Sequence, residues 1–587
     1  MSDETNGVEP QGSPEHYAIG ISFGNSYSSI AHISGEGKVE VIANEEGDRQ
    51  IPSILSYVEG EEFHGTQAKA QLVRNSKNTV AFFRDFIGKD YKSIDPTPCH
   101  ASAHPIEEKG EICFAIRDTA DSETENKISV LEIAARHLKR LKNSASDFTG
   151  RAVTSAVVAV PTDTNDEQKA ALTKAAATIQ VEILQFMPEP IAALLAYDSR
   201  SPDATADKIV LVADFGGNRS DVAVVASRGG MYSILATAHD YELGGTQLDQ
   251  VLIDHFAKEF EKKHKSDPRK NERSLAKLKL EAEAVKKALS QSSSATFSVE
   301  SLADGVDFRS TVNRSRYEIL ALKTFGRFTR LVEEVIKKAG LDVLDIDEVI
   351  MSGGTSHTPK IAKNIEALFP ESTQVLAPAT TPSALNPSEL SARGAALQAS
   401  LIQEFEKEDI DQSTHEMVTV TPHLSAAIGY QVTGQPDDVL NIIIPPDTAV
   451  PARRTKVIEG LEGDVLFRIS EGEREIKVTQ PERPAKPVTN GAKVEDANDD
   501  DDDDDDEEDD DDEPEEIREK VWRPKQPLAE FVFRGLKKGS KIEVIVNVDA
   551  EMALSIAARE IGGKGGIRGE IKAAATAAET TQQNGSA

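Results

Sequence analysis

The sequence predicts a two-lobed α/β domain followed by a β-sandwich. Up to about residue 400, apolar β-branched runs alternate with amphipathic stretches, a pattern typical of strands alternating with helices. From about residue 417 the chain instead shows short alternating strands separated by turn residues, as in a sandwich. Two similar glycine turns, too far apart for a solenoid repeat, indicate that the first domain has two related lobes.

The composition is that of a soluble multidomain protein. The 587 residues carry a net charge of −34, and part of this charge lies in an uninterrupted acidic run at 499–513. Such a charge argues against generic attraction to nucleic acid or to an anionic membrane. Cys99 and Cys113 lack the spacing of a disulfide framework or a zinc site, so we expect a reducing compartment. Without an apolar stretch of membrane-spanning length or a leader-like N-terminus, the sequence predicts a cytosolic protein with no membrane partner.

Helix and strand signals follow one another through the first domain. The run at 152–163 reads as a strand that Pro161 stops, and Thr164 to Glu167 reads as a capping box that opens a helix. Three further segments continue the pattern: a helix begun at two prolines (186–197), a helix with regular apolar spacing (273–292), and a strand, Gly-Gly turn and helix (347–369).

Composition shifts mark the expected domain boundaries. We expect a disordered N-terminal tail (1–16), the two-lobed domain (17–400), a charged interdomain linker (401–416), the β-sandwich (417–560) with a disordered acidic insertion (481–520), and a C-terminal tail (561–587). No segment after the sandwich reads as a helical lid.

The two glycine turns are the strongest functional signal. "FGNSYSSIA" at 23–31 is echoed by "FGGNRSDVAVV" at 215–225, and each follows an apolar run. Turns of this kind bring backbone N–H groups up to a phosphate, and a nearby carboxylate normally holds magnesium through its waters. Ser22 stands where the first strand would offer that carboxylate. The alternative is that both are ordinary strand–turn–strand units.

Several unrelated stretches, in order, resemble the DnaK-type heat-shock chaperones over roughly residues 17–560. They are "NEEGDRQIPSILSY" (44–57), "NTVAFFRDFIG" (78–88), "PEPIAALLAY" (188–197), "ELGGTQLD" (242–249), "SLADGVDFRSTVNRSRYE" (301–318), "NPSELSARGAALQA" (386–399) and "EGERE" (471–475). The resemblance implies an actin-like nucleotide-binding domain that holds Mg²⁺-ATP between its lobes, followed by a β-sandwich of the substrate-binding type.

The residues that the family uses for catalysis are only partly present. The family's first turn reads Asp-Leu-Gly-Thr-Thr, whereas 22–26 reads Ser-Phe-Gly-Asn-Ser. Its catalytic lysine falls on Arg84, and its glutamate is kept as Glu189. Its second turn, Asp-x-Gly-Gly-Gly-Thr, keeps Asp214, which becomes the candidate metal residue, but Arg219 replaces the hydroxyl that contacts phosphate.

The nucleoside end matches better. Lys287 stands for an arginine that stacks on the base, and His357 for a second one, although neither side chain equals a planar guanidinium. The resemblance implies the following nucleotide-binding set: Gly24, Asn25, Ser26, Tyr27, Arg84, Glu189, Asp214, Gly216, Gly217, Asn218, Arg219, Gly244, Gly245, Glu283, Lys286, Lys287, Ser290, Gly353, Gly354, Thr355 and His357.

These departures predict a pocket that binds Mg²⁺-ATP without turning it over. In phosphoryl transfer the protein positions water and metal and neutralises charge, so losing the carboxylate at 22 and the lysine at 84 removes two of those parts. We therefore assign no catalytic residue. The alternative is a site that has decayed so far that no nucleotide binds.

The connector and the missing lid suggest a function. The connector "EDIDQSTHEMVTV" lacks the leucine run that transmits the ATP signal in substrate-binding members. This pattern resembles the atypical Ssz type of the family, found with the J-domain protein zuotin in the fungal ribosome-associated complex. The resemblance implies a stable heterodimer with a zuotin-like J-domain protein, ribosome contact through that partner, and stimulation of a ribosome-bound DnaK-type chaperone in the cytoplasm. Nascent polypeptide is a further candidate partner.

Two other functions fit the same motifs. One is a nucleotide-exchange factor for another chaperone, and the other is an active ATP-dependent folding chaperone. The basic cluster at 258–270 could contact ribosomal RNA or could simply be a solvated helix face.

Overall fold

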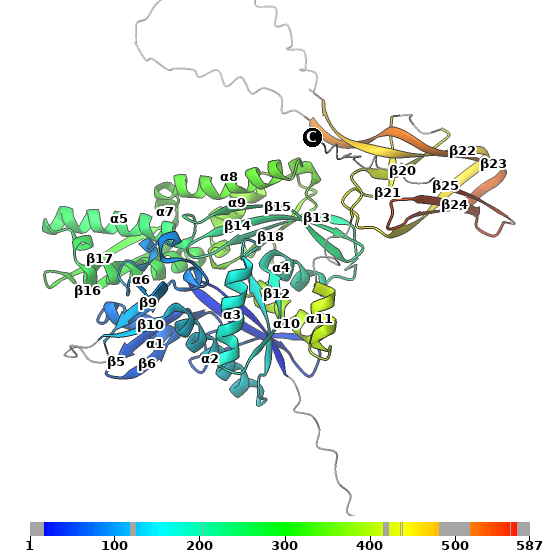
Figure 1. Ribbon diagram of the computed structural model, residues 1–587. Helices are drawn as coiled ribbons and strands as arrows, with labels where there is room; N and C mark the ends of the chain where they lie inside the picture. Colours follow the sequence, from blue (N-terminus) through cyan, green and yellow to red (C-terminus); the bar gives the residue numbers. More distant parts are fainter. Residues whose placement is uncertain are drawn as a thin grey trace, which may run out of the picture. The chain divides into compact units, whose positions relative to one another are not determined.

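The computed structural model describes residues 17–117, 125–203, 205–414, 422–434, 436, 438–479, 517–563 and 565–571. The chain forms two compact units, Met1–Val420 and Thr421–Ala587 (Figure 1). The expected N-terminal tail and the acidic run at 499–513 lie outside the described residues. Among the residues that are described, no helix is both long and apolar enough to cross a membrane.

The first lobe is built on a mixed sheet with the strand order β12-β11-β1-β2-β3. The strands are β1 (Ala18–Phe23), β2 (Tyr27–Ile33), β3 (Val39–Ile42), β11 (Ser155–Val160) and β12 (Glu182–Pro188). Helices α2 (Val130–Thr149) and α3 (Asp166–Thr178) belong to this lobe, and buried side chains of both pack with the β1 side chains Ile19 and Ile21. Since β1 pairs in parallel with β11 and antiparallel with β2, the first glycine turn lies between β1 and β2.

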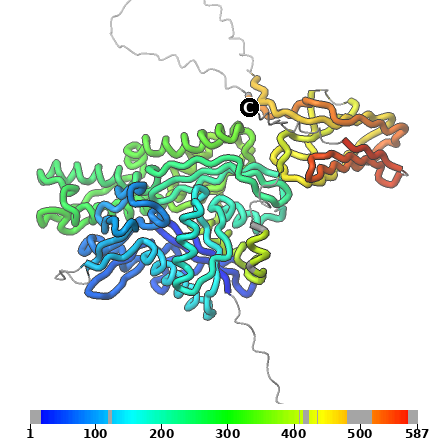
Figure 2. Tube along the Cα trace, in the orientation of Figure 1, coloured from blue at the N-terminus to red at the C-terminus, as the bar shows by residue number. Residues whose placement is uncertain are grey.

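The second lobe repeats this topology. Its sheet has the order β15-β14-β13-β18-β19, from β13 (Lys208–Phe215), β14 (Ser220–Arg228), β15 (Met231–Asp240), β18 (Glu348–Ser352) and β19 (Gln374–Leu376). Helices α5 (Gly245–His264), α6 (Glu272–Gln291), α8 (Leu322–Lys338) and α9 (Pro359–Glu366) contribute to its core. In Figure 2 the first lobe is blue to cyan and the second is green. The prediction of two similar lobes is confirmed.

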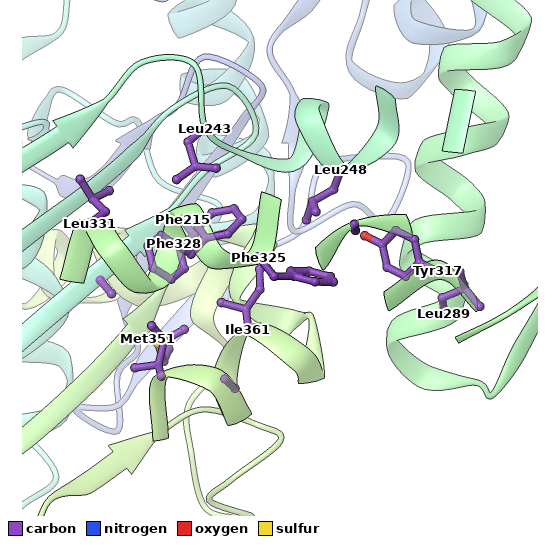
Figure 3. Close-up of a cluster of buried hydrophobic side chains, with 14 of the residues drawn as sticks. Phe215, Leu243, Leu248, Leu289, Tyr317, Phe325, Phe328, Leu331, Met351 and Ile361 are labelled. Atoms are coloured by element: carbon purple, nitrogen blue, oxygen red, sulfur yellow. The ribbon is translucent and has the colours of Figure 1, made fainter. Parts of the chain in front are cut away.

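The second lobe has the larger core, part of which Figure 3 shows. Phe215 at the end of β13 stacks edge-on against Phe328 of α8, with ring centroids 4.7 Å apart. Both rings are fully buried, as are Leu243 and Met351. This packing fixes the end of β13 and therefore the second glycine turn that follows it.

Helices α4 (Glu189–Asp198) and α10 (Leu390–Ile402) join the lobes. α10 packs on β1, β11 and α4, and α4 packs on β13 of the second lobe. The approach is close because glycine lies at the crossing: a Cβ on Gly394 would be 1.9 Å from the Ala192 carbonyl oxygen. Helix α11 (Lys407–Thr414) follows, and its Ile410 is buried with Ala18 and Ala395. Within the expected linker at 401–416, the described residues 401–414 are therefore largely helical and partly packed on the first unit.

The smaller elements complete the first unit. They are β4 (Ile51–Pro52), β5 (Ile54–Val58), β6 (Glu61–His64), α1 (Gly65–Gln71), β7 (Thr79–Ala81), β8 (Pro105–Glu108), β9 (Glu111–Ile116), β10 (Asn126–Ser129), β16 (Ser294–Ala303), β17 (Val306–Asn313), α7 (Arg314–Leu320), and the short 3-10 turns η1 (Ser76–Asn78), η2 (Arg84–Phe86), η3 (Tyr91–Ser93), η4 (Thr97–Cys99), η5 (Pro268–Lys270), η6 (Val343–Asp345), η7 (Gly354–His357) and η8 (Pro387–Glu389).

One helix start differs from the prediction. The capping box of α3 is formed by Asn165 and Gln168, one residue later than expected, because the Asn165 side chain accepts from the Gln168 N–H and Gln168 reaches back to the Asn165 N–H. Asparagine caps at least as well as threonine, so the shift is small in energy.

The second unit is one six-stranded sheet folded over on itself. Its order is β21-β20-β22-β23-β24-β25, from β20 (Ala427–Val432), β21 (Asn441–Ile444), β22 (Ala452–Thr479), β23 (Ile517–Val548), β24 (Leu554–Glu560) and β25 (Gly566–Ile571). The long β22–β23 pair changes register repeatedly between Ile458 and Val465. Bulges of this kind bend a strand.

The bend produces the sandwich core. The part of β22 that precedes the bend pairs with the end of β23, which in turn pairs with β24. The part of β22 that follows the bend pairs with β20 and with the start of β23. Side chains from both halves, such as Phe467 and Val546, are fully buried in one cluster. The strand β25 lies within the segment that the sequence predicted as a C-terminal tail.

We expect Gly394→Ala to destabilise the first unit by about 1–3 kcal/mol, because a Cβ at this crossing of α10 and α4 overlaps the Ala192 backbone. The matched control is Gly326→Ala in α8, where a Cβ meets nothing within 4 Å and where helix propensity should give a gain of about 0.5–1 kcal/mol. Denaturant unfolding monitored by circular dichroism measures both. Equal effects of the two substitutions would contradict the close packing of α10 on α4.

Candidate functional site

A cavity of about 1420 Å³ lies between the two lobes. Its walls come from the β1–β2 and β13–β14 turns, from α6, and from the Gly-Gly loop after β18. Every candidate nucleotide-binding residue except Gly244 lines it. Gly244 instead lies behind the second turn, where a Cβ would be 2.6 Å from the Gly217 carbonyl oxygen.

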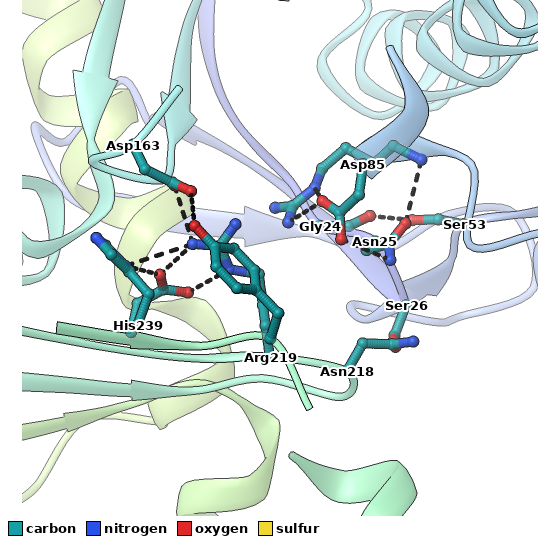
Figure 4. A network of polar contacts seen from close by, with 12 residues as sticks. Gly24, Asn25, Ser26, Ser53, Asp85, Asp163, Asn218, Arg219 and His239 are labelled. Carbon is teal, nitrogen blue, oxygen red and sulfur yellow. Dashed lines mark hydrogen bonds and ion pairs between the residues drawn. The ribbon is translucent and has the colours of Figure 1, made fainter. Parts of the chain in front are cut away.

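The two glycine turns meet at Ser26 and Asn218, both of which line the cavity (Figure 4). A Cβ on Gly217 would be 2.3 Å from the Ser26 hydroxyl oxygen, so the turns can approach only because this residue is glycine. The Ser26 hydroxyl donates to the Asn218 side-chain oxygen over 2.7 Å. The lobes are thus joined at their phosphate-type turns by a side-chain hydrogen bond.

Arg84 is held by Asp85 of the first lobe and by Glu189 at the start of α4. Its guanidinium lies 2.6 Å from the Asp85 carboxylate and 3.9 Å from that of Glu189. The Asn25 amide ties this segment to the first turn, because its oxygen accepts from the Arg84 N–H and its nitrogen donates to Asp85. Arg84 therefore already has counter-charges within the protein.

Arg219 is held even more closely, and by both lobes. Its Nε donates to Asp221 over 2.8 Å, and its Nη2 donates to Asp163, in the loop after β11, over 2.9 Å. Tyr241 packs its ring on the guanidinium, 4.6 Å from ring centroid to Cζ, and donates its hydroxyl to Asp163. His239 completes the cluster through Asp221. Asp163, Asp221 and His239 are close enough together to hold a metal ion, but the guanidinium lies among them.

Two partly buried carboxyl groups, those of Glu189 and Asp214, interact electrostatically with both arginines. Burial raises the pKa of Glu189, at the start of α4, and the neighbouring Asp214 raises it further. Burial likewise raises the pKa of Asp214, although the Ser352 hydroxyl, which donates to it over 2.7 Å, opposes the shift. The carboxylates of Asp85, Asp163 and Asp221 by themselves outnumber the two guanidinium groups at this end of the cavity.

The nucleoside end is closed by a second interlobe cluster. Glu283 of α6 pairs with Lys69 of α1 over 2.6 Å and with Lys287 over 2.7 Å, and it accepts from the Tyr27 hydroxyl. The nearby lysines hold the pKa of Glu283 well below its usual range against the effect of burial. Lys286 pairs with Asp249 at 2.8 Å.

The Gly-Gly loop packs directly on the second turn. Gly353 has φ +82°, and a Cβ there would be 2.4 Å from the Phe215 carbonyl oxygen. Thr355 donates to the Gly216 carbonyl over 2.8 Å. His357 lies within hydrogen-bond distance of Asn386 and Ser388, and burial lowers its pKa.

Sequence reasoning missed Lys69, Asp163, Tyr241 and Asp249, all of which line the cavity or pair with lining residues. Asp163 carried a usable signal, since it ends the polar turn after the buried strand β11, at the sheet edge where ligand sites gather. Lys69 lies on a helix outside every quoted motif, and Asp249 ends the stretch "ELGGTQLD" without being singled out as a site residue. Only the folded lobes bring the two side chains to the cavity.

We expect Glu189→Gln to raise the free energy of unfolding at about pH 8, with the gain shrinking as the pH falls towards 5. Because the folded pKa of Glu189 lies above the unfolded value of about 4.3, ionisation costs the folded state stability as the pH rises above that value. Urea unfolding across this pH range measures the effect, with Glu366→Gln on the exposed side of α9 as control. A pH-independent loss of stability would contradict the raised pKa.

Comparisons with known proteins agree with this geometry. The family model described as Hsp70 protein matches residues 18–485. The chain is 43% identical over 553 residues to the ribosome-associated complex subunit SSZ1 of Saccharomyces cerevisiae, covering 94% of this chain and 99% of that protein. It is 44% identical over 557 residues to heat shock protein 70 homolog C57A7.12 of Schizosaccharomyces pombe, covering 94% and 95%.

A more distant relative is the heat shock cognate 70 kDa protein 3 of Dictyostelium discoideum. The two chains are 32% identical over 463 residues, which cover 78% of this chain and 71% of that protein. The family model spans both lobes and the start of the sandwich, and the yeast relatives match nearly end to end. The chain therefore belongs to the Hsp70 family.

Proposed function

We propose that this chain binds ATP without hydrolysing it, forms a stable complex with a J-domain protein at the ribosome, and acts as co-chaperone for a chaperone that receives nascent chains. The observation that carries the proposal is the internal pairing of Arg84 and Arg219. Both guanidinium groups at the phosphate end are engaged by carboxylates of the chain itself.

The residues present fit a magnesium nucleotide. Gly24, Gly217 and Gly353 line the cavity, and each must be glycine because a Cβ would overlap a neighbouring residue of the protein. Closely packed glycine turns of this kind suit polyphosphate binding by backbone N–H groups. Asp214 is a partly buried carboxyl group that lines the cavity beside these turns and would hold Mg²⁺ through water. The phosphate end of the cavity has more carboxylates than guanidinium groups. A bound triphosphate would therefore need the positive charge of the metal ion to offset repulsion.

Loss of hydrolysis follows from what surrounds the phosphate end. Ser22, at the end of β1, offers no carboxylate for the metal's water shell. Arg84 and Arg219 have fixed partners, so neither is poised to orient water or follow charge as it develops. Each positioning or acid–base group of this kind contributes about 10²–10⁴-fold to a rate, so losing several abolishes useful turnover.

The partner part of the proposal rests on similarity. The yeast relative that this chain matches nearly end to end is named as a subunit of the ribosome-associated complex. We assign this chain a zuotin-like J-domain partner, cytoplasmic localisation at the ribosome through that partner, and a ribosome-bound Hsp70 as the stimulated chaperone. A permanently bound partner segment on the sandwich would need no ATP cycle, since tethering raises its effective concentration to roughly millimolar.

We expect tight binding of Mg²⁺-ATP with no measurable single-turnover phosphate release. Labelled ATP mixed with excess protein, followed by separation of nucleotide from phosphate, measures this, with an active ribosome-bound Hsp70 as positive control. The double variant Ser22→Asp/Arg84→Lys should recover little activity while Arg219 remains, because groups that act as a unit are not additive. Phosphate release at the control's rate, or no ATP binding, would contradict the proposal.

We expect the second unit to hold the partner. A chain ending at Thr414, which keeps α10 and α11 whole, should lose the J-domain partner in co-purification, whereas deletion of 485–515 alone should leave the complex intact. Thermal unfolding of the shortened chain serves as the folding control. Partner binding by the shortened chain as tight as that of the full chain would show that the sandwich is not the dock.

A further inference from the structure

His137 is a buried titratable side chain with no role in the function proposed above. It lies on α2 and is fully buried, packed between the rings of Phe23 and Phe83 at centroid distances of 5.7 and 5.9 Å. Its Nε2 lies 3.0 Å from the Ser28 hydroxyl oxygen. Its Nδ1 has no hydrogen-bond partner among the described residues.

The contact with Ser28 is one end of a chain that reaches the candidate site. The Ser28 hydroxyl lies 2.9 Å from the Ser53 hydroxyl, and Ser53 donates to the Gly24 carbonyl oxygen over 2.7 Å. Both serines are fully buried. The chain therefore runs from the core of the first lobe to the first glycine turn, of which Figure 4 shows the Ser53 end.

The donor and acceptor of each hydrogen bond in this chain of side chains follow from the last acceptor, the Gly24 carbonyl oxygen. A carbonyl oxygen can only accept, so Ser53 uses its single proton on Gly24. Ser53 must then accept from Ser28, and Ser28 must accept from His137. The imidazole N–H is therefore on Nε2, and the unpartnered Nδ1 is a bare acceptor, which costs less to bury than an unpaired N–H would.

Burial keeps this imidazole neutral. It lowers the pKa of His137 to about 3, so the ring carries one proton at any physiological pH. A ring that stays neutral keeps one tautomer, and a fixed tautomer keeps the chain polarised in one direction.

The consequence for the turn follows from the planarity of the peptide bond. Ser53 holds the Gly24 carbonyl through its hydroxyl and the Ser26 carbonyl through its N–H, over 3.0 Å. In a trans peptide the N–H points away from the preceding C=O, so the Asn25 N–H points away from Ser53. Gly24, Asn25 and Ser26 all line the cavity.

We propose that His137 is a positioning residue for the first glycine turn: through Ser28 and Ser53 it fixes the Gly24 carbonyl and so aims the Asn25 N–H at a phosphate group in the cavity. This inference rests on the proposed nucleotide binding for its ligand. The hydrogen-bond chain itself stands independently of any ligand.

The first test determines the tautomer of His137 in the full-length protein. With ¹⁵N-labelled histidine, and His137 assigned by its loss in His137→Gln, we expect a protonated Nε2 and an unprotonated Nδ1, unchanged between about pH 5 and pH 8. A protonated Nδ1, or titration within this range, overturns the proposal.

The second test separates positioning from folding. We expect His137→Leu, which removes the donor, to weaken Mg²⁺-ATP binding by about threefold to tenfold, and His137→Gln, whose amide can donate from the same place, to restore it to within about twofold. Leu138 is a buried neighbour on α2 that takes no part in the hydrogen-bond chain, so Leu138→Ala should lower the stability of the protein without changing its affinity for Mg²⁺-ATP. If affinity follows stability across all three variants, His137 is only a packing residue and the proposal fails.

If the wild-type protein binds no nucleotide, the proposed function fails, and the conformation of the first glycine turn is then monitored directly by NMR. The amide resonance of Asn25, assigned in ¹⁵N-asparagine-labelled protein by Asn25→Ser, should shift in His137→Leu and return in His137→Gln. An unchanged Asn25 resonance in both variants overturns the positioning role.

Discussion

The Arg219 guanidinium, between Asp163 of the first lobe and Asp221 of the second, is the interaction on which the rest of the site depends. A guanidinium group that is only 12% exposed needs counter-charges to offset its loss of hydration. Here the counter-charges belong to opposite walls of the cleft, so pairing the charge also closes the lobes. Lys69 and Glu283 do the same at the nucleoside end.

This closure explains why binding and turnover can separate in one pocket. Under the proposed function, the glycine turns would supply backbone amides and Asp214 a carboxylate for the metal, which together would hold a nucleotide. A hydrolytic site needs in addition cations and waters that can follow the charge as it develops. Arg84 and Arg219 are committed to Asp85, Asp163 and Asp221, and the buried chain from His137 fixes the first turn from behind. This geometry favours a pocket that binds a nucleotide in a fixed position over one that hydrolyses it.

The sequence predicted the two lobes because a strand ending in a glycine turn occurs twice, and it predicted the candidate residues because they lie in recognisable motifs. It could not predict the pairing of Arg219, since Asp163 is distant in sequence and meets it only when the lobes close. Tyr241 is brought beside Arg219 by the pairing of β14 with β15. His137 gave no signal, because a lone histidine in a helix is more often a core residue. The bend in β22 lies at Gly460 and Gly463, both at positive φ, and a glycine in a strand-like run marks a bulge or a turn without distinguishing them.

The most direct test is a crystal structure of the protein grown with Mg²⁺-ATP and left for days before data collection. A hydrolysis-deficient holder predicts intact ATP with its γ-phosphate in place and Arg219 still paired with Asp163 and Asp221. Density for ADP and phosphate, with Arg219 turned onto the phosphate, would contradict it.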